Sequence, residues 1–432
     1  MMGMMGMMAL PGPHDIVRHV LPNGIVILVR ENPEVASVVV QGVLDTGSLD
    51  DGPGQEGLAS FVAAMLLRGT ETRDFQTIHE LLEGSGAALG LSAGLHHTGF
   101  SGRSLAEDLP LLVELLADAV RCPAFPDEQI ERLRGQFVTA LKIQEQDTRY
   151  VAGRMFRELV YGEAHPYHRP PDGTLETVTR IARDRLVDFH RQCFGPRGMI
   201  VVVVGAVQAE AVCRLVEQHF GDWDNPGQRL PPELPPVPAL AGIVRREAAL
   251  PGKSQADIVL GASGPSRFAE DWQAANMANH ILGVFGMYGR IGAHVREKLG
   301  LAYYSFSRLD GGLGPGPWRV IAGVNPANVE EAVQAIVAEL RRITQEPVAE
   351  GELADSKANF IGRLPLQLES SEGVAGSILG MELYGLGLDY LQRYTQEIEA
   401  ITADQVREAA RRYLDPEAFA LAVAGPDRGA AQ

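Results

Sequence analysis

Along the chain, blocks in which every second residue is hydrophobic, as in strands, alternate with blocks that have the 3.6-residue period of helices. In the first half, the Asn23–Gly24 turn joins two expected strands, because Asn-Gly favours a tight hairpin. A further strand, a helix pair, two strands and a second helix pair follow. The expected elements are strands 17–21, 25–30 and 37–43, helices 57–67 and 74–83, strands 87–95 and 98–104, and helices 107–120 and 126–146.

The second half repeats this order. Its expected elements are strand 257–262, helices 269–283 and 289–298, strands 302–308 and 318–324, and helices 327–343 and 349–364. Strands 199–204 and 418–424 close the two halves. The order helix, strand, strand, helix, helix therefore occurs twice. We expect an α+β fold of two duplicated domains, each a mostly antiparallel sheet covered by helices.

A proline-rich segment divides the two halves. Six prolines lie between residues 222 and 242, and such spacing keeps the backbone extended and excludes helix or central strand. We therefore expect an N-terminal domain at 14–222, a linker at 223–242 and a C-terminal domain at 243–428.

Several short motifs, spread in order over nearly the whole chain, resemble the pitrilysin-type (M16) zinc peptidase family. They are Leu21-Pro22-Asn23-Gly24, Gly57-Leu58-Ala59, Arg68-Gly69-Thr70, His165-Pro166-Tyr167, Val203-Val204-Gly205, Leu282-Gly283 and the stretch from Arg296 to Tyr303. Each motif is weak by itself, but their order and spacing across two halves make the resemblance strong. It implies a fold like that of the mitochondrial processing peptidase.

The catalytic positions of that family hold no catalytic residues in this chain. Active members carry His-x-x-Glu-His on the first helix, where two histidines bind zinc and the glutamate activates water. The matching positions are Ser60, Ala63 and Ala64, so the zinc motif is degenerate. The resemblance places the third ligand, a glutamate, at 139–141, which reads Thr-Ala-Leu, and Glu145 is expected one turn out of place on the same helix. We expect no metal in this chain.

Histidines elsewhere offer a weak alternative metal site. His96 and His97 are expected side by side on a strand, where their side chains would point to opposite faces. His79 falls on a helix, and His165 and His168 fall in a proline-containing loop. A zinc site needs three or four converging ligands. We interpret these histidines as structural or solvated.

The second half keeps a further motif of the family. The resemblance implies that Arg296 and Tyr303, seven positions apart, orient the peptide backbone and stabilise the oxyanion in the site of a partner subunit. The alternative is structural, with Arg296 paired to Glu297 and Tyr303 in the core. Gly311, Gly312 and Gly314 form either a peptide-handling loop or a long hairpin turn.

Composition limits the classes of binding partner and the cellular compartment that we expect. The chain has 38 Lys and Arg against 55 Asp and Glu, a net charge of −17, which disfavours nucleic acid and anionic membrane surfaces as partners. The three cysteines are scattered, as in a reducing compartment. Residues 1–10 lack the positive start of a secretory signal and are expected to be disordered. The expected location is the cytoplasm.

Three functional hypotheses follow. In the first, the chain is the non-catalytic subunit of a heterodimeric peptidase. It is inactive alone, it binds unfolded peptide, and it supplies Arg296 and Tyr303 to a sister subunit that carries the zinc. In the second, it is a structural scaffold without proteolytic role. In the third, it is a homodimeric peptide-binding protein.

Overall fold

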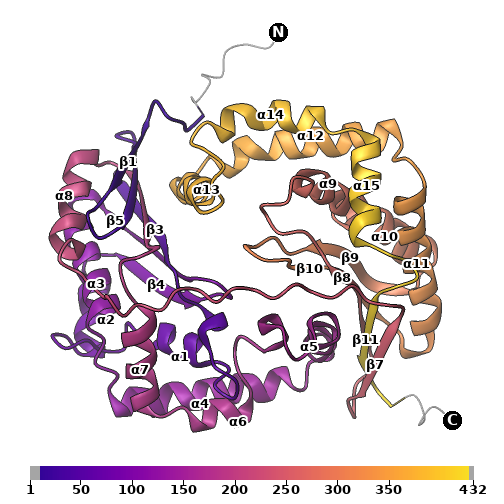
Figure 1. Cartoon of the computed structure of the whole chain (residues 1–432), viewed down its shortest axis with the longest axis horizontal. Coiled ribbons are helices and arrows are strands. Elements are labelled where there is room, and N and C mark those ends of the chain that lie inside the picture. The colour runs from indigo at the N-terminus through magenta and orange to yellow at the C-terminus, as the bar shows by residue number, and fades with distance from the viewer. Residues whose placement is uncertain (1–9, 428–432) are drawn as a thin grey trace. The chain divides into compact units, whose positions relative to one another are not determined.

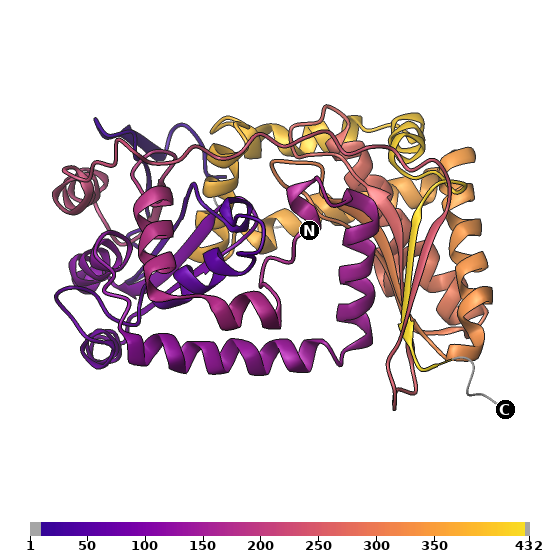
Figure 2. The ribbon, with the colours of Figure 1, turned by 60° about the horizontal axis from the view of Figure 1, so that its bottom comes forward.

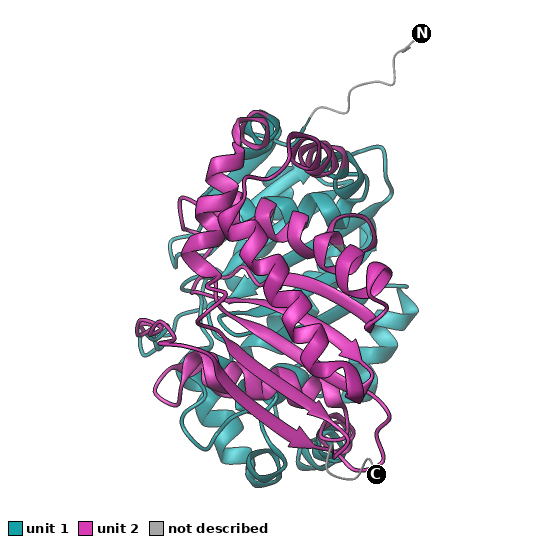
Figure 3. Cartoon of the chain, turned by 90° about the vertical axis from the view of Figure 1, so that its right-hand side faces the viewer, with its two compact units in different colours: residues 1–138, 171–232, 363–395 teal, residues 139–170, 233–362, 396–432 magenta. Residues whose placement is uncertain are grey.

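The computed structural model describes residues 10–427, and its contacts divide the chain into two compact units. The first unit contains residues 1–138, 171–232 and 363–395, and the second contains 139–170, 233–362 and 396–432 (Figure 3). The start expected to be disordered lies outside the described residues, apart from Leu10. Each unit thus takes a segment from the other half of the sequence.

The first unit is built on a six-stranded sheet in the order β1-β2-β6-β3-β5-β4. Strands β2 and β6 are parallel, whereas the other neighbours are antiparallel. The runs of Val and Ile in β3 and β6 suit strands that are covered on both faces. The strands are β1 (Ile16–Val20), β2 (Val26–Glu31), β3 (Ser37–Leu44), β4 (Ala88–Ala93), β5 (Thr98–Leu105) and β6 (Ile200–Gly205).

The second unit repeats this sheet with five strands in the order β7-β11-β8-β10-β9. Its parallel pair is β7 and β11, which takes the place of β2 and β6. In Figure 2 the yellow strand β11 lies beside strands from the middle of the chain. The strands are β7 (Val244–Ala249), β8 (Ala256–Ser263), β9 (Ala302–Leu309), β10 (Pro317–Val324) and β11 (Ala420–Gly425). The predicted α+β duplication is confirmed.

Helices cover both sheets (Figure 1). Those of the first unit are α1 (Leu58–Met65), α2 (Phe75–Gly84), α3 (Leu109–Arg121), α6 (Leu175–Arg180), α7 (Arg183–Cys193), α8 (Ala209–Phe220) and α13 (Ser371–Leu383). Those of the second unit are α5 (Thr148–Tyr161), α9 (Trp272–Gly283), α10 (Phe285–Ile291), α11 (Val329–Gln345) and α15 (Ala403–Tyr413). Helices α4 (Asp127–Gln144), α12 (Glu350–Gln367) and α14 (Tyr390–Ala400) pass from one unit to the other.

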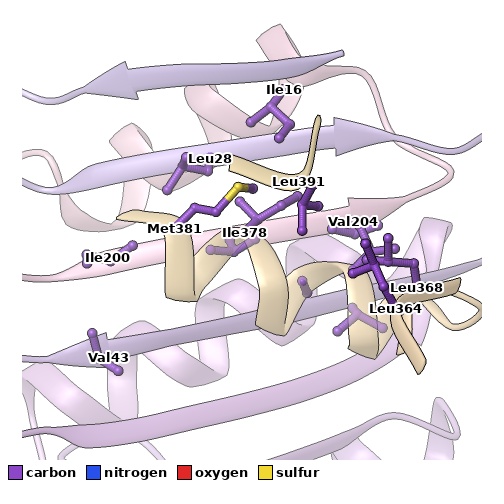
Figure 4. Packing of buried hydrophobic residues seen from close by; sticks show 14 residues of the cluster. Ile16, Leu28, Val43, Ile200, Val204, Leu364, Leu368, Ile378, Met381 and Leu391 are labelled. Carbon is purple, nitrogen blue, oxygen red and sulfur yellow. The ribbon is translucent and has the colours of Figure 1, made fainter. Parts of the chain in front are cut away.

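Two helices are exchanged between the halves of the sequence. Helix α5, from the first half, packs on β8 and β11, and α13, from the second half, packs on the matching strands β3 and β6. The exchange builds one continuous apolar core in the first unit (Figure 4). The sheet side contributes Ile16, Leu28, Val39, Val43, Ile200, Val202 and Val204, and the helical side contributes Leu364, Leu368, Val374, Ala375, Ile378, Met381 and Leu391.

Local signals explain where the exchanged helices begin. The Asp147 carboxylate accepts from the Tyr150 amide at 2.7 Å at the start of α5, and the Ser370 hydroxyl accepts from the Gly373 amide at 3.1 Å at the start of α13. Both side chains satisfy a backbone donor that a helix start leaves unpaired. The proline-rich residues 222–242 form no helix or strand in the described chain. The domain boundaries that we drew from this proline-rich segment remain a prediction.

Candidate functional site

Helix α1 keeps the frame of the zinc motif but uses its polar atoms for structure. The Asp51 carboxylate, 3% exposed, accepts from the amides of Gly57 and Ala59 at 2.9 and 2.8 Å and so caps the helix. The Ser60 hydroxyl donates to the Pro171 carbonyl at 3.0 Å. Ala63 is buried, and its methyl group and that of Ala64 offer no lone pair. These residues do not fit zinc.

The positions expected for the third ligand lie on α4. Thr139 and Ala140 are exposed and Leu141 is buried. Helix α4 ends at Gln144, so Glu145 lies in the turn after the helix rather than on it, which corrects the sequence interpretation. Within residues 10–427, no group of three His, Cys, Asp or Glu side chains is arranged to hold a metal ion.

The expectation that His96 and His97 lie on a strand is wrong. Both lie in the turn between β4 and β5, with ring centroids 6.2 Å apart. The turn follows β4 after Ala93, where Gly94 and His97 close a tight loop through a 2.7 Å backbone hydrogen bond. His165 is buried against Tyr161 and Tyr167, and its Nδ1 accepts from the Tyr167 amide at 3.0 Å.

Sequence analysis overlooked an ionisable group beside this turn. The Asp45 carboxylate lies 3.6 Å from His97 Nε2. Burial and the nearby Asp50 raise the pKa of Asp45 to about 6, and burial lowers the pKa of His97 to about 4. Burial therefore disfavours the charged form of both side chains. Asp45 belongs to no family motif, so no pattern in the sequence pointed to it.

Arg296 lies on a π-helix rather than on the α-helix expected there. The short helix predicted at 289–298 divides into α10 and the π-helix Gly292–Lys298. π-Helices are rare and occur often at functional sites. The Arg296 side chain is 31% exposed, and its Nε lies 3.5 Å from a carboxylate oxygen of Glu297. Gly300 ends the segment with φ of 64° and leads the chain into β9.

Side chains of two neighbouring helices contact the π-helix and the residues before it. His294 Nδ1 lies 2.7 Å from a carboxylate oxygen of Glu339, a residue of α11 that is 1% exposed. Arg342 Nη1 donates to both oxygens of the same carboxylate, at 3.0 and 2.9 Å. Arg290 forms a two-point pair with Glu352 of α12. The backbone that bears Arg296 is thus fixed to two helices.

Tyr303 is 61% exposed on β9, an edge strand of its sheet. The alternative that placed Tyr303 in the core is therefore wrong. The next residue, Tyr304, points to the other face because side chains alternate along a strand. Its hydroxyl donates to the buried Asp257 carboxylate, which also accepts from Thr148 Oγ1 at 2.5 Å. Burial raises the pKa of Tyr304, and the hydrogen bond to Asp257 raises it further.

The glycine-rich segment forms the connection between β9 and β10. Gly314 is buried, and a Cβ there would lie 2.3 Å from the Tyr167 hydroxyl oxygen, so packing requires glycine at this position. Gly311 is exposed, and Gly312 accepts a backbone hydrogen bond from Arg267 at 2.9 Å. A peptide-handling role of Gly311, Gly312 and Gly314 stays a prediction.

Two edge strands offer backbone groups to a ligand. Strand β4 pairs with β5 alone among the described strands of its sheet, and β9 pairs with β10 alone among those of the other. Helix α1 packs against β4, and the π-helix against β9. Each unit therefore places an edge strand beside its candidate functional helix.

This arrangement defines a class: a duplicated α+β protein with the frame of an inverted zinc motif but none of its ligands. Residues 26–165 match the family described as "Insulinase (Peptidase family M16)", and residues 180–360 match "Peptidase M16 inactive domain". The chain belongs to peptidase family M16.

Individual relatives agree with this assignment. An "uncharacterized zinc protease" of Mycobacterium leprae is 28% identical, with 95% of this chain and 92% of the relative covered. The mitochondrial-processing peptidase subunit beta of Saccharomyces cerevisiae is 24% identical, with 89% and 86% covered. The crystal structure of a peptidase M16 inactive domain from Pseudomonas fluorescens is 24% identical and has a TM-score of 0.87, with 95% and 98% covered. It supports the fold.

Proposed function

We propose that this chain is the non-catalytic subunit of a two-subunit M16 peptidase. The sister subunit is a chain of the same family that keeps His-x-x-Glu-His and carries the zinc. This chain contributes peptide binding together with Arg296 and Tyr303. The observation that carries the proposal is the contrast between the two motifs. The positions of the zinc motif hold Ser60, Ala63 and Ala64, whereas Tyr303 projects from an edge strand that follows the Arg296 π-helix.

The chemistry of the two retained side chains suits a developing negative charge. A guanidinium donates several hydrogen bonds in a fixed plane, and a phenol donates one. Both residues belong to one segment, in which the Gly300 amide donates to the Arg296 carbonyl at 3.1 Å and the chain then enters β9. Such donors act best when the backbone that holds them is rigid. The Glu339 and Glu352 pairs provide that rigidity.

Peptide binding is supported by the edge strands. An extended peptide adds to an exposed sheet edge through main-chain hydrogen bonds, which tolerate many sequences. Strand β4 has alternating exposed and half-buried residues. It pairs with β5 alone among the described strands of its sheet, so a ligand backbone could pair with its other edge. Unfolded peptide, rather than a folded protein, meets this geometry.

The test measures zinc content and cleavage of an unfolded peptide by this chain alone, by the sister alone and by the two together. We expect the chain alone to be metal-free and inert, and the pair to be active. Arg296→Ala should lower kcat of the pair by roughly 10²–10³-fold, the usual loss for one oxyanion donor. Tyr303→Phe, which removes only a hydroxyl, should cause a smaller loss.

Arg411→Ala provides a control, because Arg411 is another arginine of the second unit with a local acidic partner, Glu408 at 3.3 Å. It should leave turnover unchanged. Equal losses in the Arg296 and Arg411 variants would refute the assigned role. Stoichiometric zinc in this chain, or cleavage without the sister, would refute the non-catalytic assignment. Inertness of the assembled pair would favour the scaffold, and peptide binding by a homodimer would favour the third hypothesis.

The location is proposed on independent grounds. Cys122, Cys193 and Cys213 are free thiols, and burial raises the pKa of each. Thiols kept from ionising are inert and persist in a reducing compartment. Scattered free thiols are typical of proteins from a reducing compartment, and we propose that the pair is cytoplasmic. No helix within residues 10–427 has the length and apolar character needed to cross a membrane.

A further inference from the structure

Strand β9 contains a β-bulge at Tyr303. From the far end of the two strands to the pair of Tyr304 with Gly323, β9 and β10 match residue for residue. The next pair is Ala302 with Val324, so Tyr303 is one extra residue on β9. Bulges of this kind are common at sheet edges and beside active sites, where they change the direction of a side chain.

The bulge accounts for the exposure of Tyr303. Side chains alternate along a regular strand, so without the bulge Tyr303 would share a face with Ser305 and Ser307. Those two serines are 0% and 2% exposed, whereas Tyr303 is 61% exposed. The place of the Tyr303 hydroxyl therefore depends on the residues that hold the bulge.

Tyr304, directly after the bulge, reaches across the neighbouring strand. Tyr304 of β9, Gly323 of β10 and Asp257 of β8 lie in register, in one row across three strands. The Tyr304 hydroxyl donates to the Asp257 carboxylate, so the tyrosine ring spans β10 to reach β8. A Cβ at Gly323 would lie 2.5 Å from Cε1 of Tyr304. The glycine thus leaves room for the ring.

The acceptor of this hydrogen bond is itself fixed. Asp257 is 1% exposed, and its carboxylate also accepts from Thr148 Oγ1 at the start of α5, at 2.5 Å, and from Gln255 Nε2 at 3.2 Å. The Arg149 guanidinium lies over the Tyr304 ring, 5.4 Å from its centroid. Buried polar groups that all have partners make a structure rigid. Tyr304 is therefore tied both to β8 and to α5.

We propose that Tyr304 is a positioning residue, which holds the bulge through Asp257 and so sets where the Tyr303 hydroxyl lies. A donor to a developing charge must be held to within about 0.5 Å of its productive place. The benefit for turnover rests on the proposed function of Tyr303. The positioning itself is a property of this chain, and it is measured without the sister subunit.

The first experiment uses the full chain alone, with a fluorotyrosine incorporated at position 303 and observed by fluorine NMR. Tyr304→Phe removes only a hydroxyl, and it should shift the signal by more than its linewidth or split it. Gly323→Ala keeps every side-chain hydrogen-bonding group but displaces the Tyr304 ring, and it should have the same effect. If Gly323→Ala does not fold, Tyr304→Phe decides.

Tyr413→Phe is the matched control. Tyr413 is another half-buried tyrosine of the second unit, and its hydroxyl donates to the Asp271 carboxylate at 2.9 Å. An arginine also lies over its ring, because Arg412 is 5.6 Å from the centroid. The variant removes the same group from a similar setting outside β9, so it should leave the fluorine signal of residue 303 unchanged.

The second experiment measures cleavage by the assembled pair. Tyr304→Phe should lower kcat by roughly tenfold, because a displacement of about 1 Å costs up to about 10²-fold. KM should stay within about twofold, as expected for an interaction made only in the transition state. Combined with Tyr303→Phe, the change should add no further loss, because the hydroxyl that Tyr304 positions is already absent.

The two experiments separate this inference from the proposed function. An unchanged fluorine signal in Tyr304→Phe, or an equal change in Tyr413→Phe, overturns the positioning role. So do losses of kcat that add in full in the double variant. A shifted fluorine signal supports the positioning role. If the pair with Tyr303→Phe is then as active as the parent, the proposed function of Tyr303 fails and its positioning by Tyr304 stands.

Discussion

Replacement of Ile378 by alanine tests whether the exchanged helix α13 stabilises a sheet built by the opposite half of the sequence. Ile378 is 0% exposed and belongs to the core that contains Val202 and Val204 of β6 (Figure 4). Alanine would leave a cavity between α13 and the sheet. Large-to-small changes of this kind cost about 2–5 kcal/mol. Because domain stabilities are about 5–15 kcal/mol, the loss is a substantial fraction of the total.

Amide hydrogen exchange, measured by mass spectrometry, shows both where in the fold stability is lost and how much is lost. If the first unit opens as a cooperative body, protection in β3 and β6 should fall on the order of 30-fold to several thousand-fold. Peptides from β8 and β10 should change little, because α13 packs on β3 and β6, whereas β8 and β10 belong to the second unit. The largest effect is therefore expected far from residue 378 in the sequence.

Ile143→Ala makes the same chemical change at a residue of α4 that is 67% exposed. It should alter the free energy of unfolding by no more than about 0.5 kcal/mol, because the removed methyl groups already contact water. The reasoning is refuted if Ile378→Ala lowers protection in β8 and β10 while β3 and β6 stay unchanged. It is also refuted if the Ile378 and Ile143 variants are equally stable.

Two further predictions concern buried polar groups. Tyr304→Phe should lower the free energy of unfolding by roughly 1–3 kcal/mol, because Asp257 loses a donor inside the core, whereas Tyr303→Phe should cost under about 0.5 kcal/mol. Equal effects in denaturant titrations would contradict the assigned orientations. Asp45→Asn should stabilise the protein above pH 6 and have little effect near pH 3.5. The raised pKa, from 3.8 to about 6, means that the folded state binds the proton more tightly, so ionised Asp45 costs stability that accumulates as pH rises from about 4 to 6. The full shift corresponds to at most about 3 kcal/mol, and parallel stability curves of parent and variant over this range would contradict the prediction.

Strands were predictable where both faces are buried. The run 199–204 is almost wholly apolar and appears as β6 (Ile200–Gly205), and 37–43 appears as β3 (Ser37–Leu44). Strand β7 was missed because Val-Arg-Arg-Glu-Ala-Ala lies at a sheet edge and is mostly exposed, so it carries no alternating pattern. Charged residues on an edge strand prevent it from pairing with other chains. The same residues remove the alternating hydrophobic pattern by which a strand is predicted.

The helix exchange and the π-helix lay beyond sequence reasoning for a different reason. An amphipathic pattern shows that a helix buries one face, but it does not identify the sheet that receives that face. The hydrogen-bond register of residues 292–298 likewise depends on distant residues, since Glu339 and Glu352 hold this region through His294 and Arg290. The exposed position of Tyr303 was foreseeable only through the family motif, because two adjacent tyrosines on a strand leave open which one faces the core.

The structure of α1 explains how a member of this family can lack zinc ligands and keep its fold. The helix is held at its start by the Asp51 carboxylate and along its length by Phe61, Val62 and Met65, each fully buried. None of these residues stands at a ligand position of the zinc motif, and Ser60, which does, donates a hydrogen bond to the Pro171 carbonyl instead. The positions that bind zinc in active relatives can therefore change without a cavity or an unpaired buried charge. Loss of the zinc ligands and retention of the fold are therefore physically independent.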